Sequence, residues 1–217
     1  MMPVGIWLVF VIKEKIAGKL LGVFVMKEYE KLMTKDDQGY MWIPDSEFEY
    51  NISYIKDFLQ GDTGLDLGCG CNPLITDKDC LHFDMSPQPK AVELVGGRFL
   101  QQDVSRLNRH VFSVKVDWIF SSHMLEDLPS VYDMANCLND WSTLVKPGGY
   151  IVLLLPDIEN GRYPTIAEGG NPSHKVDIGP KLFLEEVVPE LIHLRVCQID
   201  TIPREKSCTF DVVLQKL

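Results

Sequence analysis

Short apolar runs alternate with segments of helical periodicity through most of this chain. Apolar residues recur at helical spacing over 47–59 and again over 130–145, which predicts an amphipathic helix in each segment. Apolar runs that end at polar residues or glycine predict five strands, at 63–67, 80–83, 99–101, 117–121 and 150–155. The remaining predicted elements are a helix near 181–188 and two β-rich stretches at 190–202 and 208–216.

The order of these elements predicts an α/β sheet. Strands that alternate with helices are joined by right-handed crossovers, so the sheet should be doubly wound and mostly parallel. The run 150–155 is apolar throughout, as expected of a central strand covered on both faces, and Pro-Gly-Gly at 147–149 is predicted to break the chain before it. The connection 203–207 is too short for a helical crossover, so the last strand is predicted to run antiparallel to its neighbour. We therefore predict a single domain over 47–217.

Residues 1–46 do not fit this alternation and are predicted to form an N-terminal extension. Their apolar runs, 3–12 and 20–26, are separated by charged residues, and both are shorter than the roughly 20 residues that a membrane span needs. Three interpretations remain open: an extra strand or helix packed on the domain, a membrane-surface anchor, or an artefact of start-site choice that adds residues 1–25. The first and the last are favoured, so attachment to a membrane is not expected.

Polar residues and glycines stand at the ends of the predicted strands, where doubly wound sheets bind ligands. The first strand contains Asp66 and leads into Gly68-Cys69-Gly70, where glycines let the backbone approach a ligand closely. Asp84 ends the second strand, where an acid can accept hydrogen bonds from ribose hydroxyls. Asp103 ends the third strand and can accept from an adenine amino group, while the Val104 N–H donates to the ring. The sequence therefore predicts a nucleoside lying across these strand ends.

The turn after the first strand favours S-adenosylmethionine over a dinucleotide. A dinucleotide fingerprint needs glycine or alanine at the third position of G-x-G-x-x-G/A, and Pro73 stands there. Asp66, two residues before the first glycine, favours a cationic group over a phosphate. S-adenosylmethionine carries an ammonium and a sulfonium group and no phosphate, so the charges predict this cofactor.

Three segments, which follow one another in the expected order along the chain, resemble class I S-adenosylmethionine-dependent methyltransferases of the type 11 subgroup. LDLGCG at 65–70 is similar to motif I, SSHMLEDL at 121–128 to the segment after strand 4, and LVKPGGY at 144–150 to the approach to strand 5. The resemblance implies a Rossmann-like fold and methyltransferase activity. Asp127 departs from the subgroup, which often has histidine at that position.

The resemblance also implies contacts between individual residues and the cofactor. They are Asp66, Gly68 and Gly70 for the methionine part, Asp84 for the ribose, Asp103 and Val104 for the adenine, Ser121 for the amino-acid part or the mouth of the pocket, and Cys69 and Met85 as further cofactor contacts. Each of the three aspartates and Ser121 also has a structural alternative, as a buried hydrogen-bond partner or as a cap of the following turn or helix.

Two histidines are candidate general bases if the acceptor is a hydroxyl, which must lose a proton during methyl transfer. His123 follows the fourth strand. His174 lies in 156–180, a long irregular segment rich in glycine and proline. Such segments are uncommon unless they are functional, so 156–180 is predicted to form a substrate-side insertion. Either histidine could instead pack or cap within its loop.

The charge of the chain narrows the choice of acceptor. Lys and Arg number 21 against 31 Asp and Glu, a net charge of −10, which disfavours nucleic acid as the substrate. The chain has no Asp/Asn-Pro-Pro-Tyr motif and no Pro-Cys dipeptide, which argues against amino-methylation of DNA bases and against cysteine attack on cytosine. We therefore expect a small-molecule or sugar-like acceptor that is methylated on oxygen. Two alternatives remain: a catalytically inactive scaffold with a methyltransferase fold, and a nicotinamide-dependent oxidoreductase.

The six cysteines show no spacing typical of a disulfide framework. Cys69 and Cys71 form C-x-C, but a zinc site would need two more ligands at suitable spacing, so no metal site is expected. Free thiols are typical of a reducing cytosol, and a cytoplasmic location is therefore predicted.

Overall fold

The computed structural model describes residues 46–70, 72–74, 76, 78–86, 92 and 97–217. The predicted N-terminal extension, with both of its apolar runs, therefore lies outside the described residues except for Ser46. Within the described ranges, no helix is long and apolar enough to cross a membrane.

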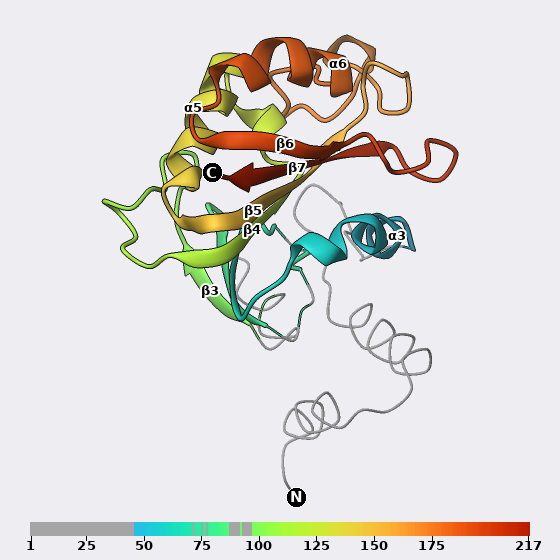
Figure 1. Ribbon diagram of the computed structural model, residues 1–217. Helices are drawn as coiled ribbons and strands as arrows, with labels where there is room; N and C mark the ends of the chain where they lie inside the picture. Colours follow the sequence, from blue (N-terminus) through green and yellow to red (C-terminus); the bar gives the residue numbers. More distant parts are fainter. Residues whose placement is uncertain (1–45, 71, 75, 77, 87–91, 93–96) are drawn as a thin grey trace, which may run out of the picture.

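Seven strands form one sheet in the order β3-β2-β1-β4-β5-β7-β6 (Figure 1). The strands are β1 (Thr63–Leu67), β2 (Asp79–Asp84), β3 (Arg98–Gln101), β4 (Val116–Ser122), β5 (Val145–Pro156), β6 (Leu194–Ile199) and β7 (Thr209–Lys216). Neighbours are parallel from β3 to β5, and β7 runs antiparallel to both β5 and β6. The prediction of a doubly wound, mostly parallel sheet with an antiparallel last strand is confirmed. The strand order reverses between β1 and β4, which is where such sheets form a ligand-binding crevice.

The helices lie where they were predicted but are less regular. The first is α3 (Ser46–Ile55), which continues as the 3₁₀ turn η1 (Lys56–Phe58). The second is α5 (Val131–Ser142), which begins after Ser130 because the Ser130 hydroxyl accepts the Asp133 N–H. The other helical segments are η2 (Leu125–Asp127), η3 (Ile166–Glu168), α6 (Pro180–Leu182), the π-helix η4 (Phe183–Val187) and η5 (Val188–Glu190). The last three replace the single helix predicted near 181–188.

Alternate side chains of β4, β5 and β7 pack into two separate cores, one on each face of the sheet. On one face, Trp118 of β4 packs with Ile55 of α3. On the other face, the next residue, Ile119, packs with Trp141 of α5. Figure 1 accordingly shows α5 and α6 on one side of the sheet and α3 on the other. Both faces of the central strands are therefore covered, which explains why the run 150–155 in β5 is apolar throughout.

Strand β5 begins at Val145, earlier than the predicted start at residue 150. Pro-Gly-Gly at 147–149 was predicted to break the chain and instead lies inside the strand, where the register with β4 shifts after Val116. The backbone approaches so closely here that a Cβ at Gly149 would lie 2.3 Å from the Asp117 carbonyl oxygen. The glycines therefore make a bulge that prolongs the strand rather than a turn that ends it.

Candidate functional site

A cavity of about 350 Å³ opens at the carboxyl ends of β1, β4 and β5, within the usual volume range of small-molecule sites. Its walls come from α3, the turn after β1, the ends of β4 and β5, the segment 156–180 and the start of β7. The lining residues are Glu47, Phe48, Asn51, Asp66, Gly68, Cys69, Gly70, Asn72, Ser122, His123, Leu154, Tyr163, Asn171, Cys208 and Thr209. The cavity thus joins the two regions predicted to hold the cofactor and the acceptor.

The turn after β1 folds back onto the end of β2. The backbone N–H groups of Gly68 and Cys69 both donate to the Phe83 carbonyl, at 2.8 and 3.0 Å. Gly70 has a left-handed φ of +51° and donates its N–H to Asp84 Oδ2 at 2.8 Å. The described residues between β1 and β2 form no helix. The glycine backbone borders the cavity, as the predicted close approach to a ligand requires.

Asp66 is buried and already bonded within the protein. Its Oδ2 accepts the Leu74 N–H at 2.7 Å and lies 2.8 Å from Nδ1 of His82. His82, which the sequence analysis did not single out, stands directly opposite Asp66 in the β1–β2 register. Asp66 therefore has the structural role that was left open as its alternative. It also borders the cavity, so its predicted place near a cofactor ammonium group stays a prediction.

Asp84 stands at the tip of β2, where both of its oxygens accept backbone N–H groups. Oδ2 accepts that of Gly70, and Oδ1 accepts that of Ser86 at 2.7 Å. Met85 beside it is 65% exposed. Neither Asp84 nor Met85 is among the cavity-lining residues that the structure describes, and residues 87–91 and 93–96 lie outside the description. The ribose contact of Asp84 and the cofactor contact of Met85 therefore stay predictions.

Asp103 and Val104 follow the end of β3. Asp103 is exposed, and its Oδ1 accepts the Ser105 N–H at 2.9 Å, which is the capping role left open for it. Val104 is buried, and its carbonyl accepts the Trp141 Nε1–H at 2.8 Å, which fixes this loop against α5. Their adenine contacts also stay predictions.

Ser121 and Ser122 differ in their surroundings at the end of β4. Ser121 is buried, and its hydroxyl donates to the Leu67 carbonyl at 2.7 Å, which joins β4 to β1. Ser122 borders the cavity. Consecutive strand residues point in opposite directions, so only one of the two can face a ligand. Ser122 rather than Ser121 lines the cavity, and the cofactor contact of Ser121 stays a prediction.

Both candidate histidines lie around Glu126, a residue that the sequence analysis did not single out. Glu126 is fully buried on η2, three residues after His123. Its Oε1 lies 3.3 Å from His123 Nδ1 and 3.5 Å from His174 Nε2. His123 reaches the cavity, with a side chain that is 33% exposed, whereas His174 is buried beneath the stacked ring of Tyr163. We call His123, Glu126 and His174 the His–Glu–His cluster.

Three hydrogen bonds hold the segment 156–180 against η2. The backbone N–H groups of Lys175 and Val176 donate to the Glu126 carbonyl at 2.8 and 3.2 Å. The Ser173 hydroxyl donates to Asp127 Oδ1 at 2.7 Å. Burial raises the pKa of Asp127, although the bond from Ser173 acts in the opposite direction. Asp127, the position that departs from the resemblance, thus helps to place the loop that carries His174.

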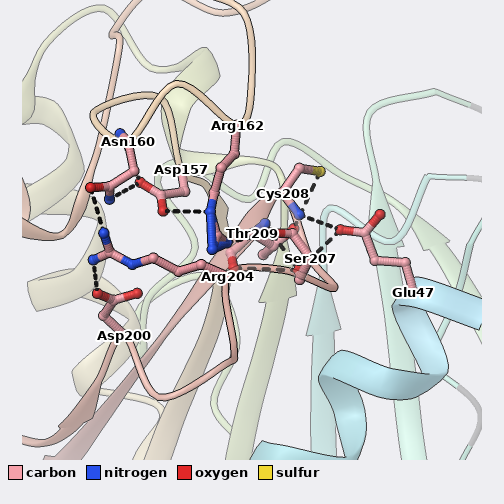
Figure 2. A network of polar contacts seen from close by, with 9 residues as sticks. All are labelled: Glu47, Asp157, Asn160, Arg162, Asp200, Arg204, Ser207, Cys208 and Thr209. Carbon is pink, nitrogen blue, oxygen red and sulfur yellow. Dashed lines mark hydrogen bonds and ion pairs between the residues drawn. The ribbon is translucent and has the colours of Figure 1, made fainter.

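A network of polar contacts supports the cavity wall where α3 meets the connection between β6 and β7 (Figure 2). Glu47 Oε1 accepts the Cys208 N–H at 2.7 Å and the Ser207 hydroxyl at 3.0 Å. Arg162 donates to the Ser207 carbonyl and lies 3.8 Å from the buried Asp157. Burial and Glu47 raise the pKa of the Cys208 thiol to about 11. Because Glu47 and Cys208 both border the cavity, the network fixes two of its sides relative to each other.

Comparisons with known proteins find similarity in structure. No protein-family model matches the sequence, and no curated protein sequence matches it. The CcbJ methyltransferase from Streptomyces caelestis is 12% identical with a TM-score of 0.61, over 88% of this chain and 96% of that one. The N-methyltransferase NodS from Bradyrhizobium japonicum, in complex with S-adenosyl-L-homocysteine, is 13% identical with a TM-score of 0.59, over 88% and 98% of the two chains.

A third similar structure is an S-adenosylmethionine-dependent methyltransferase from Clostridium acetobutylicum. It is 13% identical with a TM-score of 0.58, over 91% of this chain and 99% of that one. Identities this low concern the arrangement of helices and strands alone. The chain has the Rossmann-like α/β fold that these S-adenosylmethionine-dependent methyltransferases share.

Proposed function

We propose that this protein is an S-adenosylmethionine-dependent methyltransferase that methylates a hydroxyl group of a small-molecule or saccharide-like acceptor. One observation carries the proposal: a single cavity is bordered by the glycine turn after β1 and also by His123 at the end of β4. Both features stand at the edge of the sheet where doubly wound folds bind their ligands. The similar protein NodS was solved with S-adenosyl-L-homocysteine bound, which supports the choice of cofactor.

The charges around the glycine turn favour a cationic ligand. Asp66 and Glu47 border the cavity, and Asp84 accepts the N–H of Gly70, which is one of the lining residues. These groups would attract the ammonium and sulfonium of S-adenosylmethionine and would repel the pyrophosphate of a dinucleotide. The turn thus supports the methyltransferase over the nicotinamide-dependent alternative.

Methyl transfer depends mainly on positioning the two reactants in line within the cavity. The acceptor oxygen attacks the methyl carbon, the carbon–sulfur bond breaks, and the electron pair of that bond stays on sulfur. We assign the loss of the hydroxyl proton to the His–Glu–His cluster, where His123 is the residue that borders the cavity. The segment 156–180 contributes Tyr163 and Asn171 to the lining and would be the acceptor-side insertion of one catalytic domain. The net charge of −10 supports an acceptor other than nucleic acid.

Calorimetric titration of the purified chain with S-adenosylmethionine, S-adenosyl-L-homocysteine and NAD tests the cofactor. We expect micromolar binding of the two adenosyl compounds and none of NAD. Asp84→Ala should weaken binding by about 2 kcal/mol, which is roughly 30-fold, the scale of a lost charge-assisted hydrogen bond. Asp79→Ala is the matched control, because Asp79 lies at the opposite end of β2 and pairs with Arg98 on the surface.

Transfer of a labelled methyl group to a panel of hydroxyl- and amine-bearing compounds then identifies the acceptor atom. Binding without transfer to any acceptor would favour the inactive scaffold. Failure of a folded chain to bind either adenosyl compound would refute the proposal. Unchanged affinity in folded Asp84→Ala would refute the assignment of the ribose site.

A further inference from the structure

Glu126 is a buried carboxylate that the protein leaves without a proper partner. It has no exposed surface, and neither of its oxygens has a hydrogen-bond partner among the described residues. Nε2 of His174 is also buried, and it too has no hydrogen-bond partner within the described part of the chain. A buried charge is strongly destabilising unless it is paired or coordinates a metal ion. A positively charged group between these side chains would therefore stabilise the buried carboxylate of Glu126.

The geometry of the cluster suits a metal ion. The three possible ligand atoms, one from each residue, all lie within 4.8 Å of one another. The separations of 3.3 and 3.5 Å from Glu126 Oε1 to the two histidines are long for hydrogen bonds. Tetrahedral zinc with bonds of about 2.0–2.1 Å places neighbouring ligand atoms about 3.3–3.4 Å apart. The two separations from Glu126 to the histidines are thus already close to the spacing of zinc ligands, and the two histidine nitrogens lie within 4.8 Å of each other.

We propose that His123, Glu126 and His174 bind a divalent metal ion, with zinc as the ion that fits best. Two imidazoles and one carboxylate form a known ligand set of catalytic zinc sites, which keep a fourth position open for water or substrate. Magnesium prefers oxygen ligands and is disfavoured by the two imidazoles. No metal site was expected from the sequence because the cysteines lack the spacing of zinc ligands. The proposed site contains no cysteine, so the spacing of the cysteines does not bear on it.

Neighbouring residues hold the ligands in place. His123 Nε2 lies 3.2 Å from the Thr209 hydroxyl, which orients the ring so that Nδ1 faces Glu126. The bonds from Lys175 and Val176 to the Glu126 carbonyl fix the turn that carries His174. The backbone of His123 is left-handed, with φ +52°, a conformation that is uncommon outside glycine and is often found at functional sites.

The open position of this metal site would face the cavity, because His123 borders it while the other two ligands are buried. What the metal does there rests on the proposed function. Bound to the acceptor hydroxyl, it would lower the pKa of that group, so the proton would pass to a solvent water and the oxygen would attack the methyl carbon. The histidines would then serve as ligands rather than as free bases.

Titration of the whole chain with Zn²⁺ alone, after treatment with EDTA and dialysis, tests the site. We expect one Zn²⁺ per chain at micromolar affinity or tighter, and no comparable binding of Mg²⁺. Glu126→Gln and His174→Ala should each weaken zinc binding by about 100-fold or more. His110→Ala, which removes an exposed histidine outside the cluster, should leave the affinity for zinc unchanged. Equal zinc affinity in the cluster variants and the wild type would overturn the proposal.

Thermal unfolding separates a lost ligand from a damaged fold. In EDTA, Glu126→Gln should be at least as stable as the wild type, because a neutral amide replaces a buried carboxylate. Added Zn²⁺ should raise the Tm of the wild type and leave that of Glu126→Gln unchanged. A Glu126→Gln variant that is less stable already in EDTA, with no effect of zinc on the wild type, would indicate a metal-free ion pair and overturn the proposal.

Binding of S-adenosyl-L-homocysteine to the same metal-free samples separates this proposal from the proposed function. If the adenosyl compound binds and zinc does not, only the metal site is refuted. If zinc binds and the adenosyl compound does not, the metal site stands and the methyltransferase assignment fails.

Discussion

Replacing Asp66 with alanine would remove the carboxylate that joins β1 to β2 beneath the cavity. Two buried groups would lose their partner: the Leu74 N–H, 2.7 Å from Oδ2, and Nδ1 of His82, 2.8 Å from it. Each buried polar group left without a partner costs about 1–3 kcal/mol. Asp66→Ala should therefore lower the free energy of unfolding by about 2–6 kcal/mol, a large part of the about 5–15 kcal/mol that is typical of a native protein.

Urea denaturation followed by circular dichroism measures this loss. His82→Ala and the double variant complete a thermodynamic cycle. Because both single variants remove the same contact, the double variant should lose less than their sum, by at least about 1 kcal/mol. Asp66→Asn is the matched control, since its amide oxygen can still accept the Leu74 N–H. Its free energy of unfolding should fall by less than that of Asp66→Ala. A loss below about 1 kcal/mol for Asp66→Ala, or an additive cycle, would refute the structural role of this carboxylate.

Ser121→Ala should lower the free energy of unfolding by about 1 kcal/mol, the value of its hydrogen bond to Leu67, and leave S-adenosyl-L-homocysteine affinity unchanged in calorimetry. Weaker binding by the folded variant would restore the pocket role predicted for Ser121. The hydrogen bond from Lys146 lowers the pKa of Asp117 to about 2 from its ordinary 3.8, so this carboxylate stabilises the fold above pH about 4 and less as the pH falls toward 2. Asp117→Asn should therefore cost more stability at about pH 5 than at about pH 3 in urea denaturation, and an equal loss at both would contradict this.

The run 150–155 could be recognised as a strand from the sequence because burial on both faces leaves a continuous apolar run. The predicted strand 63–67 coincides with β1, although it contains the buried Asp66. The start of β5 could not be predicted in the same way, because Pro-Gly-Gly at 147–149 has the local chemistry of a turn. Only its pairing with β4 and the close approach of Gly149 to the Asp117 carbonyl show that it forms a bulge. Long-range pairing thus overrode a local preference.

The candidate site could be predicted only where neighbouring strands bring residues together. The glycine turn follows directly from its place after β1, and parallel pairing opposite Asp66 would have pointed to His82 as well. The meeting of His123 with His174 depends on the path of the segment between them. That path is fixed by hydrogen bonds to the backbone of Glu126, which leave no local pattern in the sequence.

Strand β7 lies between β5 and β6 although it is the last of the three along the chain. In the described sheet β6 pairs with β7 alone, so β6 can join the sheet only after β7 has paired with β5. The bond that joins Glu47 to Cys208 at the cavity wall links residues 161 positions apart. During synthesis, therefore, the amino-terminal strands can assemble early, but the ligand cavity cannot close until residues 208–216 have left the ribosome.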